Sequence, residues 1–417
     1  MRLAAAIKPL RLPGFGRLAG AYLVNEMGNW LGEVALAIIV FDQTGSPVAT
    51  AGLFVAMQFV PALATPPLVA RIDHLHSRTA LGLLYLSEAA AFVVLALLAT
   101  DTSFVLALVL LIAAIDGTLA TAARARTRAA AGLILEPSGL LREGNGILNV
   151  GFTAGAAAGP ALAGVLVATA GVQTALLADA ASFLAVAVLL ATSRAMPAAH
   201  EDDRGAGWIV RMQRGLGYVR ERVALRRLMV AEGVAFVFFA LVLPIEVAFA
   251  KETLDAGDVG YGLLLGFWGV GMVLGSIVFS ALGTTSLRTL LVGGTVAIGV
   301  AYCLTGIAPT LALACAASAL GGAGNGVQWV ALVTAVQSLT ASAYQARVIG
   351  LLESLASGLS GLGFLAGGLI AALLSPRASY LVAGLGVLVV LGVAATLLWD
   401  TQLEPAADED GADVAGE

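Results

Sequence analysis

Apolar runs divide this chain into twelve segments, each long enough to cross a lipid bilayer as an α-helix. A membrane span needs about 20 mostly apolar residues. The breaks between the runs carry turn or charge signals, as at Asp42–Pro47, Gly171, Pro309 and Ser375–Pro376. The pattern predicts spans at 18–41, 48–70, 79–100, 103–123, 144–169, 172–193, 228–250, 259–282, 289–307, 310–336, 348–374 and 379–399.

The composition excludes a soluble protein. The chain is 59% hydrophobic and 12% charged, with a mean hydropathy of +0.94. A soluble domain has about 25% charged residues, because its surface must interact with water. We therefore expect an all-α membrane protein that lies in a lipid bilayer.

The basic residues predict how the spans are oriented. If the N-terminus is cytoplasmic, all of the 22 lysines and arginines except Lys251 and Arg377 fall on the cytoplasmic side. Short cytoplasmic loops of membrane proteins carry such an excess of positive charge. We expect a multi-pass protein of the bacterial inner membrane with both termini in the cytoplasm.

Two polar segments set the limits of the predicted domains. Residues 194–227 carry eight arginines, and the part from 208 to 228 can form an amphipathic helix. This helix either lies on the anionic leaflet or keeps two bundles in register. The tail 400–417 carries seven acids and no base, which predicts disorder and excludes nucleic acid binding there. The predicted parts are a cytoplasmic N-terminus (1–17), a six-helix bundle (18–193), the basic linker (194–227), a second six-helix bundle (228–399) and the acidic cytoplasmic tail (400–417).

The two halves resemble each other. The segment Gly146–Gly164 of the fifth span can be laid on Gly350–Gly368 of the eleventh, 204 positions later, and Gly52 matches Gly262. Two similar six-span halves are typical of duplicated secondary transporters, whose binding site lies between the halves. We therefore expect two pseudo-symmetric six-helix bundles.

The sequence has no motif for nucleotide hydrolysis and no motif for a metal site. It has no glycine-rich phosphate loop that ends in Lys and Ser or Thr. Its three histidines, His74, His76 and His200, have no metal-ligand spacing. We expect no metal and no cofactor, and a proton gradient as the energy source.

Acidic residues inside the first span are candidates for a transport pathway. Glu26, Asn29 and Glu33 lie at positions i, i+3 and i+7 and therefore share one helix face. A charge at the bilayer centre costs about 2.5–3.5 kcal/mol, so such residues usually face the bundle interior. Two carboxylates on one face repel each other, which favours proton uptake by one of them. They could carry a proton, pair with a cationic substrate, or form a structural hydrogen-bond network.

Two further acids, Asp116 and Glu246, also lie within predicted spans. Arg124 follows Asp116 by eight residues on the same face, so the two could form a structural pair. Glu246 lies five residues before Lys251 and could contact water at the outer end of its span. Both acids are candidates for the proton or substrate pathway.

Three motifs carry a family resemblance. The loop Arg71–Arg78 reads RIDHLHSR, the first span contains NEMGNWLGEVA, and the fifth span contains GAAAGPALAG at Gly155–Gly164. These segments resemble motifs of major facilitator superfamily transporters, of the branch that includes siderophore and multidrug exporters. In the loop motif Asp73 and Arg78 match, whereas Val69, His74 and Ser77 replace a Gly and two Arg.

The resemblance implies roles for the matching residues. Asp73 and Arg78 would latch the cytoplasmic ends of the bundles. Gly155, Gly159, Pro160 and Gly164 would form the helix seam associated with antiporters. Glycines allow two helices to approach closely, and a proline inside a helix leaves a carbonyl without its usual donor, which makes the helix easier to bend.

The sequence and the resemblance together predict a secondary active transporter with the major facilitator fold. We expect a monomer that exports a small organic molecule or drug in exchange for protons by alternating access. An uptake symporter of the same fold is the alternative, because direction depends on coupling and not on fold. A channel or an enzyme fits less well, since no polar catalytic cluster lies at a membrane interface.

Overall fold

The computed structural model describes residues 8–72, 75–100, 103–193, 216–282, 285–340 and 344–397. Every regular element in this part of the chain is helical. The prediction of an all-α protein is confirmed, and the helices follow the predicted spans closely.

Six spans form the N-terminal bundle. The second of them consists of three consecutive pieces, because a π-helical turn, η2, interrupts it and two adjacent prolines lie in its last part. The elements are α2 (Phe15–Thr44), α3 (Pro47–Phe54), η2 (Val55–Phe59), α4 (Val60–Ile72), α5 (Ser77–Leu98), α6 (Leu106–Leu135), α7 (Leu141–Ala170) and α8 (Val172–Ala191).

Six further spans form the C-terminal bundle, and the first of these is also broken. Pro244 has no N–H to donate, so the helix α10 ends and a short turn, η4, follows before helix resumes. The elements are α10 (Val223–Ala240), η4 (Leu243–Ile245), α11 (Glu246–Ala248), η5 (Phe249–Thr253), α12 (Gly257–Ala281), α13 (Leu287–Ile307), α14 (Leu311–Ser338), α15 (Gln345–Leu373) and α16 (Pro376–Leu397).

Eleven described helices are long and apolar enough to cross a membrane by length and composition. The predicted tenth span, α14, does not reach that hydropathy because its centre holds several glycines together with Asn325 and Gln328. It nevertheless runs over 28 residues and packs beside α12 and α13. It therefore completes the second set of six.

The helix of the fourth span is longer than the predicted span. The apolar run predicted a span at 103–123, and α6 continues beyond it to Leu135. Arg124, Arg126 and Arg128 therefore lie on the helix itself. Arginine has a good intrinsic helix propensity, so charge marks the end of an apolar run without ending the helix.

The turns form where the sequence carries turn signals. Gly45 ends α2 in the left-handed conformation, and its N–H donates to the carbonyl of Phe41. The Ser46 hydroxyl then caps α3 by accepting from the N–H of Ala49, and Pro47 occupies the first helical turn, where no N–H is needed. Gly171 similarly separates α7 from α8.

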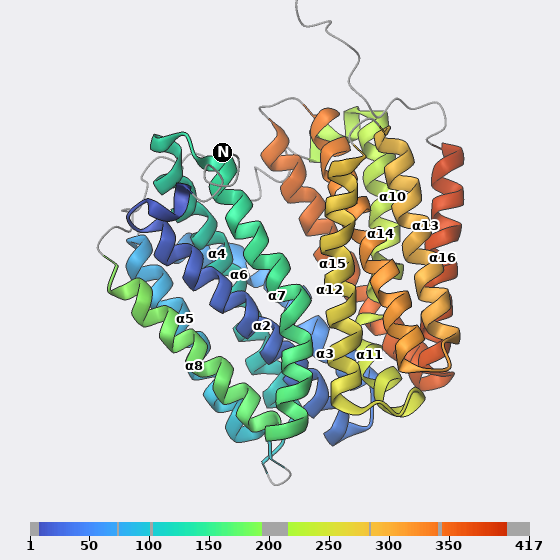
Figure 1. Cartoon of the computed structure of the whole chain (residues 1–417), viewed down its shortest axis with the longest axis horizontal. Coiled ribbons are helices and arrows are strands. Elements are labelled where there is room, and N and C mark those ends of the chain that lie inside the picture. The colour runs from blue at the N-terminus through green and yellow to red at the C-terminus, as the bar shows by residue number, and fades with distance from the viewer. Residues whose placement is uncertain are drawn as a thin grey trace, which may run out of the picture.

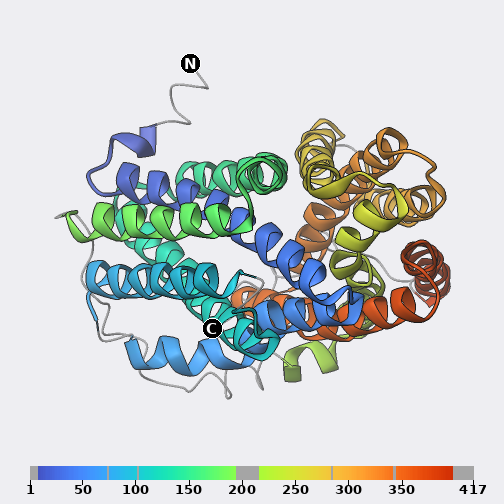
Figure 2. The ribbon, with the colours of Figure 1, turned by 90° about the horizontal axis from the view of Figure 1, so that it is seen from below.

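The two bundles meet along two pairs of helices, α7 with α12 and α3 with α15. Figure 1 shows the bundles converging at the side that carries α11, and separating toward the side where α2 begins and α16 ends. We call the latter the termini side and the former the opposite side. Seen from below in Figure 2, the N-terminal bundle (blue to green) and the C-terminal bundle (yellow to red) lie next to each other.

Glycines give the two halves equivalent contacts. Gly159 packs on Trp30 of the first span, and Gly363, 204 positions later, packs on Val237 and Ala240 of the seventh. Gly164 contacts α12 of the other bundle, and its counterpart Gly368 contacts α3 of the other bundle. The offset seen in the sequence thus corresponds to a twofold relation between the bundles.

The basic linker is described only from residue 216. Residues 216–221 are helical, but Arg222 adopts an extended conformation and α10 begins at Val223. The continuous amphipathic helix predicted over 208–228 is therefore interrupted, and its first part, 208–215, lies outside the described residues. Tyr218 and Val219 are buried against the C-terminal bundle, so this piece packs on protein.

Candidate functional site

A cavity of about 320 Å³ lies between the two bundles. This volume is within the range of pockets that hold small organic molecules, roughly 300–1,000 Å³. The N-terminal bundle contributes lining residues from α2, η2 and α7, and the C-terminal bundle contributes the rest. The lining residues are Trp30, Gln58, Phe152, Ala156, Phe239, Ala240, Val242, Leu243, Glu246, Leu265, Trp268, Gly269, Met272, Tyr302, Asn325, Ser360 and Phe364.

Aromatic rings form much of the cavity wall. Trp268 and Tyr302 stack with ring centroids 5.4 Å apart and an interplanar angle of 17°. The Tyr302 hydroxyl donates to the carbonyl oxygen of Phe239 at 3.2 Å, where α10 approaches its end. These contacts hold the rings in place, so the wall is preformed.

Glu246 is the one residue with a carboxylate or basic group among the described residues that line the cavity. It follows directly after the break at Pro244, so the interruption of the span places it there. Its side chain is buried, and the Tyr380 hydroxyl donates to its Oε1 at 3.1 Å. The sequence identified Glu246 and left contact with water as one possibility, whereas its side chain is only 5% exposed in the structure.

The predicted acids of the first span lie beside the cavity, not in its wall. Glu26 is buried, receives a hydrogen bond from Tyr22, and packs on Gly155 of α7. Asn29 has a buried Nδ2 with no hydrogen-bond partner, and Glu33 is half-buried. The residue of this helix that does line the cavity is Trp30.

A cluster of three buried carboxylates occupies the interior of the N-terminal bundle. Glu88 of α5, Asp116 of α6 and Asp179 of α8 interact electrostatically, and each has at least one oxygen without a hydrogen-bond partner. The Ser182 hydroxyl donates to Asp179 Oδ1 at 3.1 Å. Asp116 thus belongs to a cluster of acids that come from three different spans. The sequence of a single span does not indicate such a cluster.

Arg124 is a cation that acts on several of these acids. It interacts electrostatically with Glu26 and Glu33 of α2, with Glu88 and with Asp116. Asp116, which the sequence allowed to pair with Arg124, interacts with it electrostatically, but the same arginine also acts on the other three acids.

The carboxylates do not form a metal site. In the described part of the chain, no group of three or more His, Cys, Asp or Glu side chains is arranged to hold a metal ion.

Two glycines of α2 make room for Asp179. A methyl group added at Gly28 would overlap Asp179 Oδ1, and one at Gly32 would overlap Oδ2 and the ring of Phe92. The carboxylate thus lies against the backbone of α2. The four-residue spacing of these glycines is the sequence signal that could have indicated this close approach.

The predicted helix seam has two faces. Gly155 and Gly159 face α2 inside the N-terminal bundle, and a Cβ at Gly159 would lie 2.6 Å from Trp30 Cβ. Gly164 faces the other bundle, where a Cβ would lie 2.6 Å from the Asp258 carbonyl oxygen, and the carbonyl of Pro160 lies against Gly262. The motif therefore joins α7 to its own bundle and to α12 at once.

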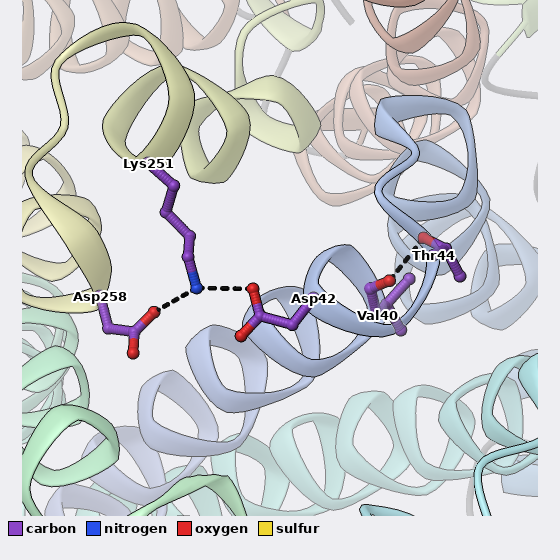
Figure 3. Close-up of polar contacts among 5 residues, drawn as sticks. All are labelled: Val40, Asp42, Thr44, Lys251 and Asp258. Atoms are coloured by element: carbon purple, nitrogen blue, oxygen red, sulfur yellow. Dashed lines mark hydrogen bonds and ion pairs between the residues drawn. The ribbon is translucent and has the colours of Figure 1, made fainter. Parts of the chain in front are cut away.

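A bridge of charged residues joins the bundles on the opposite side. The ammonium group of Lys251 lies 2.6 Å from Asp42 Oδ1 and 2.7 Å from Asp258 Oδ1 (Figure 3). Asp42 belongs to the N-terminal bundle, whereas Lys251 and Asp258 belong to the C-terminal bundle. Sequence reasoning used Lys251 and Asp42 only to mark the ends of spans.

The predicted cytoplasmic latch is only partly described. Asp73 lies outside the described residues, and Arg78 is exposed at the start of α5. Arg126 of α6, which the sequence did not single out, donates from Nη2 to the carbonyl oxygen of Leu75 at 2.8 Å. This bond holds the loop between α4 and α5 against the bundle.

Comparisons with known proteins agree with this architecture. Residues 4–413 match the family described as "Transmembrane secretion effector". No curated protein matches the sequence.

Solved structures of transporters share the fold at low sequence identity. The nucleoside transporter NupG is 11% identical, with a TM-score of 0.76, and the match covers 92% of this chain and 98% of that one. A bacterial homologue of the iron transporter ferroportin, in an inward-facing state, is 16% identical with a TM-score of 0.70, covering 92% and 98%. A mutant of the peptide transporter POT in complex with alafosfalin is 11% identical with a TM-score of 0.72, covering 95% and 98%.

Proposed function

This chain belongs to the family described as transmembrane secretion effectors, and from that premise we propose that it is a proton-coupled exporter of a small organic molecule. It is a multi-pass membrane transporter of the major facilitator fold. The proposal adds the direction of transport, the energy source and the kind of substrate.

The observation that carries the proposal is the cavity between the two bundles together with the bridge beyond it. A site between pseudo-symmetric halves can be exposed to either side of the membrane by rocking of one half against the other. Lys251 joins the halves on the opposite side, while they separate toward the termini side (Figure 1). This arrangement is that of an inward-facing transporter if both termini are cytoplasmic.

Protons are the proposed coupling ion, and no cofactor takes part. The carboxylates Glu33, Glu88 and Asp116 share one guanidinium, that of Arg124, and Asp179 interacts with the last two of them. An acid that is buried without a fixed partner is more stable when it is protonated. Alternating access would let such groups take up a proton on one side of the membrane and release it on the other.

The direction of transport can be measured directly. We would prepare inside-out and right-side-out membrane vesicles, impose a pH gradient across each, and follow a fluorescent aromatic amine. An exporter accumulates the amine in inside-out vesicles when their interior is acidic, and an uncoupler abolishes the accumulation. Proton-driven accumulation in right-side-out vesicles alone would instead establish an uptake symporter.

The orientation has its own test. In a chain with Cys303 and Cys315 replaced by Ser, cysteines at the exposed positions Glu252 and Ser138 should label differently with an impermeant thiol reagent added to cells. We expect labelling at Glu252, on the opposite side, and none at Ser138. The reverse pattern would place the termini outside the cytoplasm.

A further inference from the structure

The cavity carries enough chemistry to define a substrate class, and this step rests on the proposed transport function. We propose that the cavity binds a compact aromatic cation, with its positive group paired to Glu246 and its ring against the aromatic wall. Charge, wall chemistry and size each support this assignment.

Charge decides between cations and anions. Glu246 is 5% exposed, and no other lining residue among those described carries a carboxylate or a basic group. A buried carboxylate that has lost its water is stabilised by a cation close to it. An anionic ligand would be repelled by Glu246 and would find no Arg or Lys in the wall to bind.

The wall chemistry favours an aromatic ligand. Six of the lining residues are aromatic, and both bundles contribute them; these are Trp30, Phe152, Phe239, Trp268, Tyr302 and Phe364. Aromatic faces attract a cation within about 6 Å of the ring centroid, and they also stack on aromatic ligands. A ligand with a positive group and an aromatic ring would be stabilised both by attraction of the cation and by stacking of the rings.

The remaining polar groups of the wall are neutral, and a tyrosine outside the wall bonds to the acid. Gln58, Asn325 and Ser360 also line the cavity and can bond to neutral substituents of a ligand. The Tyr380 hydroxyl, which donates to Glu246 Oε1 from outside the lining, limits how the carboxylate can turn. The acid is therefore held in one orientation for an incoming cation.

Size limits the ligand to a compact molecule. The cavity volume of about 320 Å³ is near the lower end of the range for pockets that hold drug-sized ligands. It suits a molecule of two or three fused rings with a short cationic substituent. Because walls from both bundles enclose it, the ligand would contact both halves at once.

Three probes of the same shape test the assignment by charge alone. They carry a naphthylmethyl group joined to trimethylammonium, to methyl sulfone, or to sulfonate, and are therefore cationic, neutral and anionic. Binding to the purified full chain in detergent is followed by quenching of tryptophan fluorescence, since Trp30 and Trp268 lie in the wall. We expect the cation to bind roughly tenfold more tightly than the sulfone, and the sulfonate not to bind.

Two variants test whether Glu246 is the residue that recognises the positive charge of the ligand. In Glu246→Gln the preference for the cation over the sulfone should fall to about twofold or less, while sulfone binding persists. Glu232→Gln is the matched control: Glu232 is also a buried acid of the C-terminal bundle, bonded to Gln328, but it does not line the cavity. It should keep the full preference.

Each outcome has a clear meaning. Equal binding of the cation and the sulfone by the wild type, or tighter binding of the sulfonate, would overturn the assignment even if Glu246→Gln proved unstable. An unchanged preference in a folded Glu246→Gln protein would also overturn it. If the cationic probe binds but a pH gradient does not drive its transport in vesicles, the substrate assignment stands and the proposed export is wrong.

Discussion

At the scale of single residues, the position of a buried acid depends on the small residues that pack against it. Asp179 can lie against α2 only because positions 28 and 32 are glycines. This contact brings a carboxylate into the same bundle interior as Glu88 and Asp116. The residues nearest to the acids therefore determine whether the bundle can pack at all.

The first prediction tests that close approach. Gly32→Ala should lower the free energy of unfolding by roughly 1–3 kcal/mol, because the added methyl overlaps Asp179 and Phe92 and the packed interior must shift. Thermal unfolding of the purified protein in detergent measures the change. Gly20→Ala, on the same helix with nothing within 4 Å of the added methyl, is the control and should not lower the melting temperature. Equal melting temperatures for the two variants would contradict the contact.

The second prediction concerns coupling. Glu33 is half-buried and interacts electrostatically with Tyr261 of the other bundle as well as with Arg124. If it carries the exchanged proton, Glu33→Gln should abolish transport driven by a pH gradient and retain counterflow exchange of substrate.

The comparison variant for this test is Glu26→Gln. Glu26 lies deep inside the N-terminal bundle, bonded to Tyr22 and near Arg124 and Arg128, and a structural role predicts that binding and exchange fall together with the amount of folded protein. If both variants transport normally with unchanged pH dependence, neither acid of the first span carries the proton. Asp116 would then be the next residue to substitute.

At the scale of elements, α7 acts as the connection between two packing partners. One face, with Gly155 and Gly159, packs on α2, and another, with Pro160 and Gly164, packs on α12 of the other bundle. Phe152 and Ala156 of the same helix line the cavity. A change in the position of α7 therefore affects its own bundle, the contact between bundles and the cavity wall together.

The third prediction tests this role. Gly159→Leu should leave the protein inserted in the membrane but abolish transport, because leucine displaces Trp30 and with it part of the cavity wall. Transport in vesicles and the amount of protein in the membrane are the two measurements. Gly146→Leu, on the same helix where an added Cβ has no atom within 4 Å, should transport normally. Normal transport by Gly159→Leu would mean that the contact with α2 does not matter for the cycle.

At the scale of the whole molecule, a bridge of charged residues joins the bundles on the opposite side. Lys251 bonds to Asp42 across the interface and to Asp258 within its own bundle (Figure 3). The Lys251 and Asp42 side chains are 22% and 41% exposed. Ion pairs of this exposure contribute about 1 kcal/mol or less, so the bridge can break during a transport cycle.

The fourth prediction is that this bridge biases the equilibrium between the two transporter states. Lys251→Ala should increase the population that is open on the opposite side by at most about fivefold, the factor that corresponds to about 1 kcal/mol. Spin labels at Gln173 and Glu252, one in each bundle on that side, would report the increase as a larger share of long distances. Lys251→Arg, which keeps the positive charge beside Asp42 and Asp258, is the control and should keep the wild-type distribution. An unchanged distribution in Lys251→Ala would mean that helix packing alone closes this side.

The sequence by itself determined the spans, their number and the twofold repeat, because these depend on apolar length and on residues close together in the chain. It also identified Glu246 and the glycines of α7 as candidates. What only the tertiary structure decided is which side chains meet: Glu246 with the aromatic wall, Asp179 with Gly28 and Gly32, and Lys251 with Asp42. Those contacts join residues from different helices. The apolar periodicity of one helix does not specify which neighbouring helix packs against it, and it does not specify where the helix ends. The course of α6 past residue 123 is an example, because the apolar run does not show that the helix continues to Leu135 or that Arg124 interacts with acids of three helices.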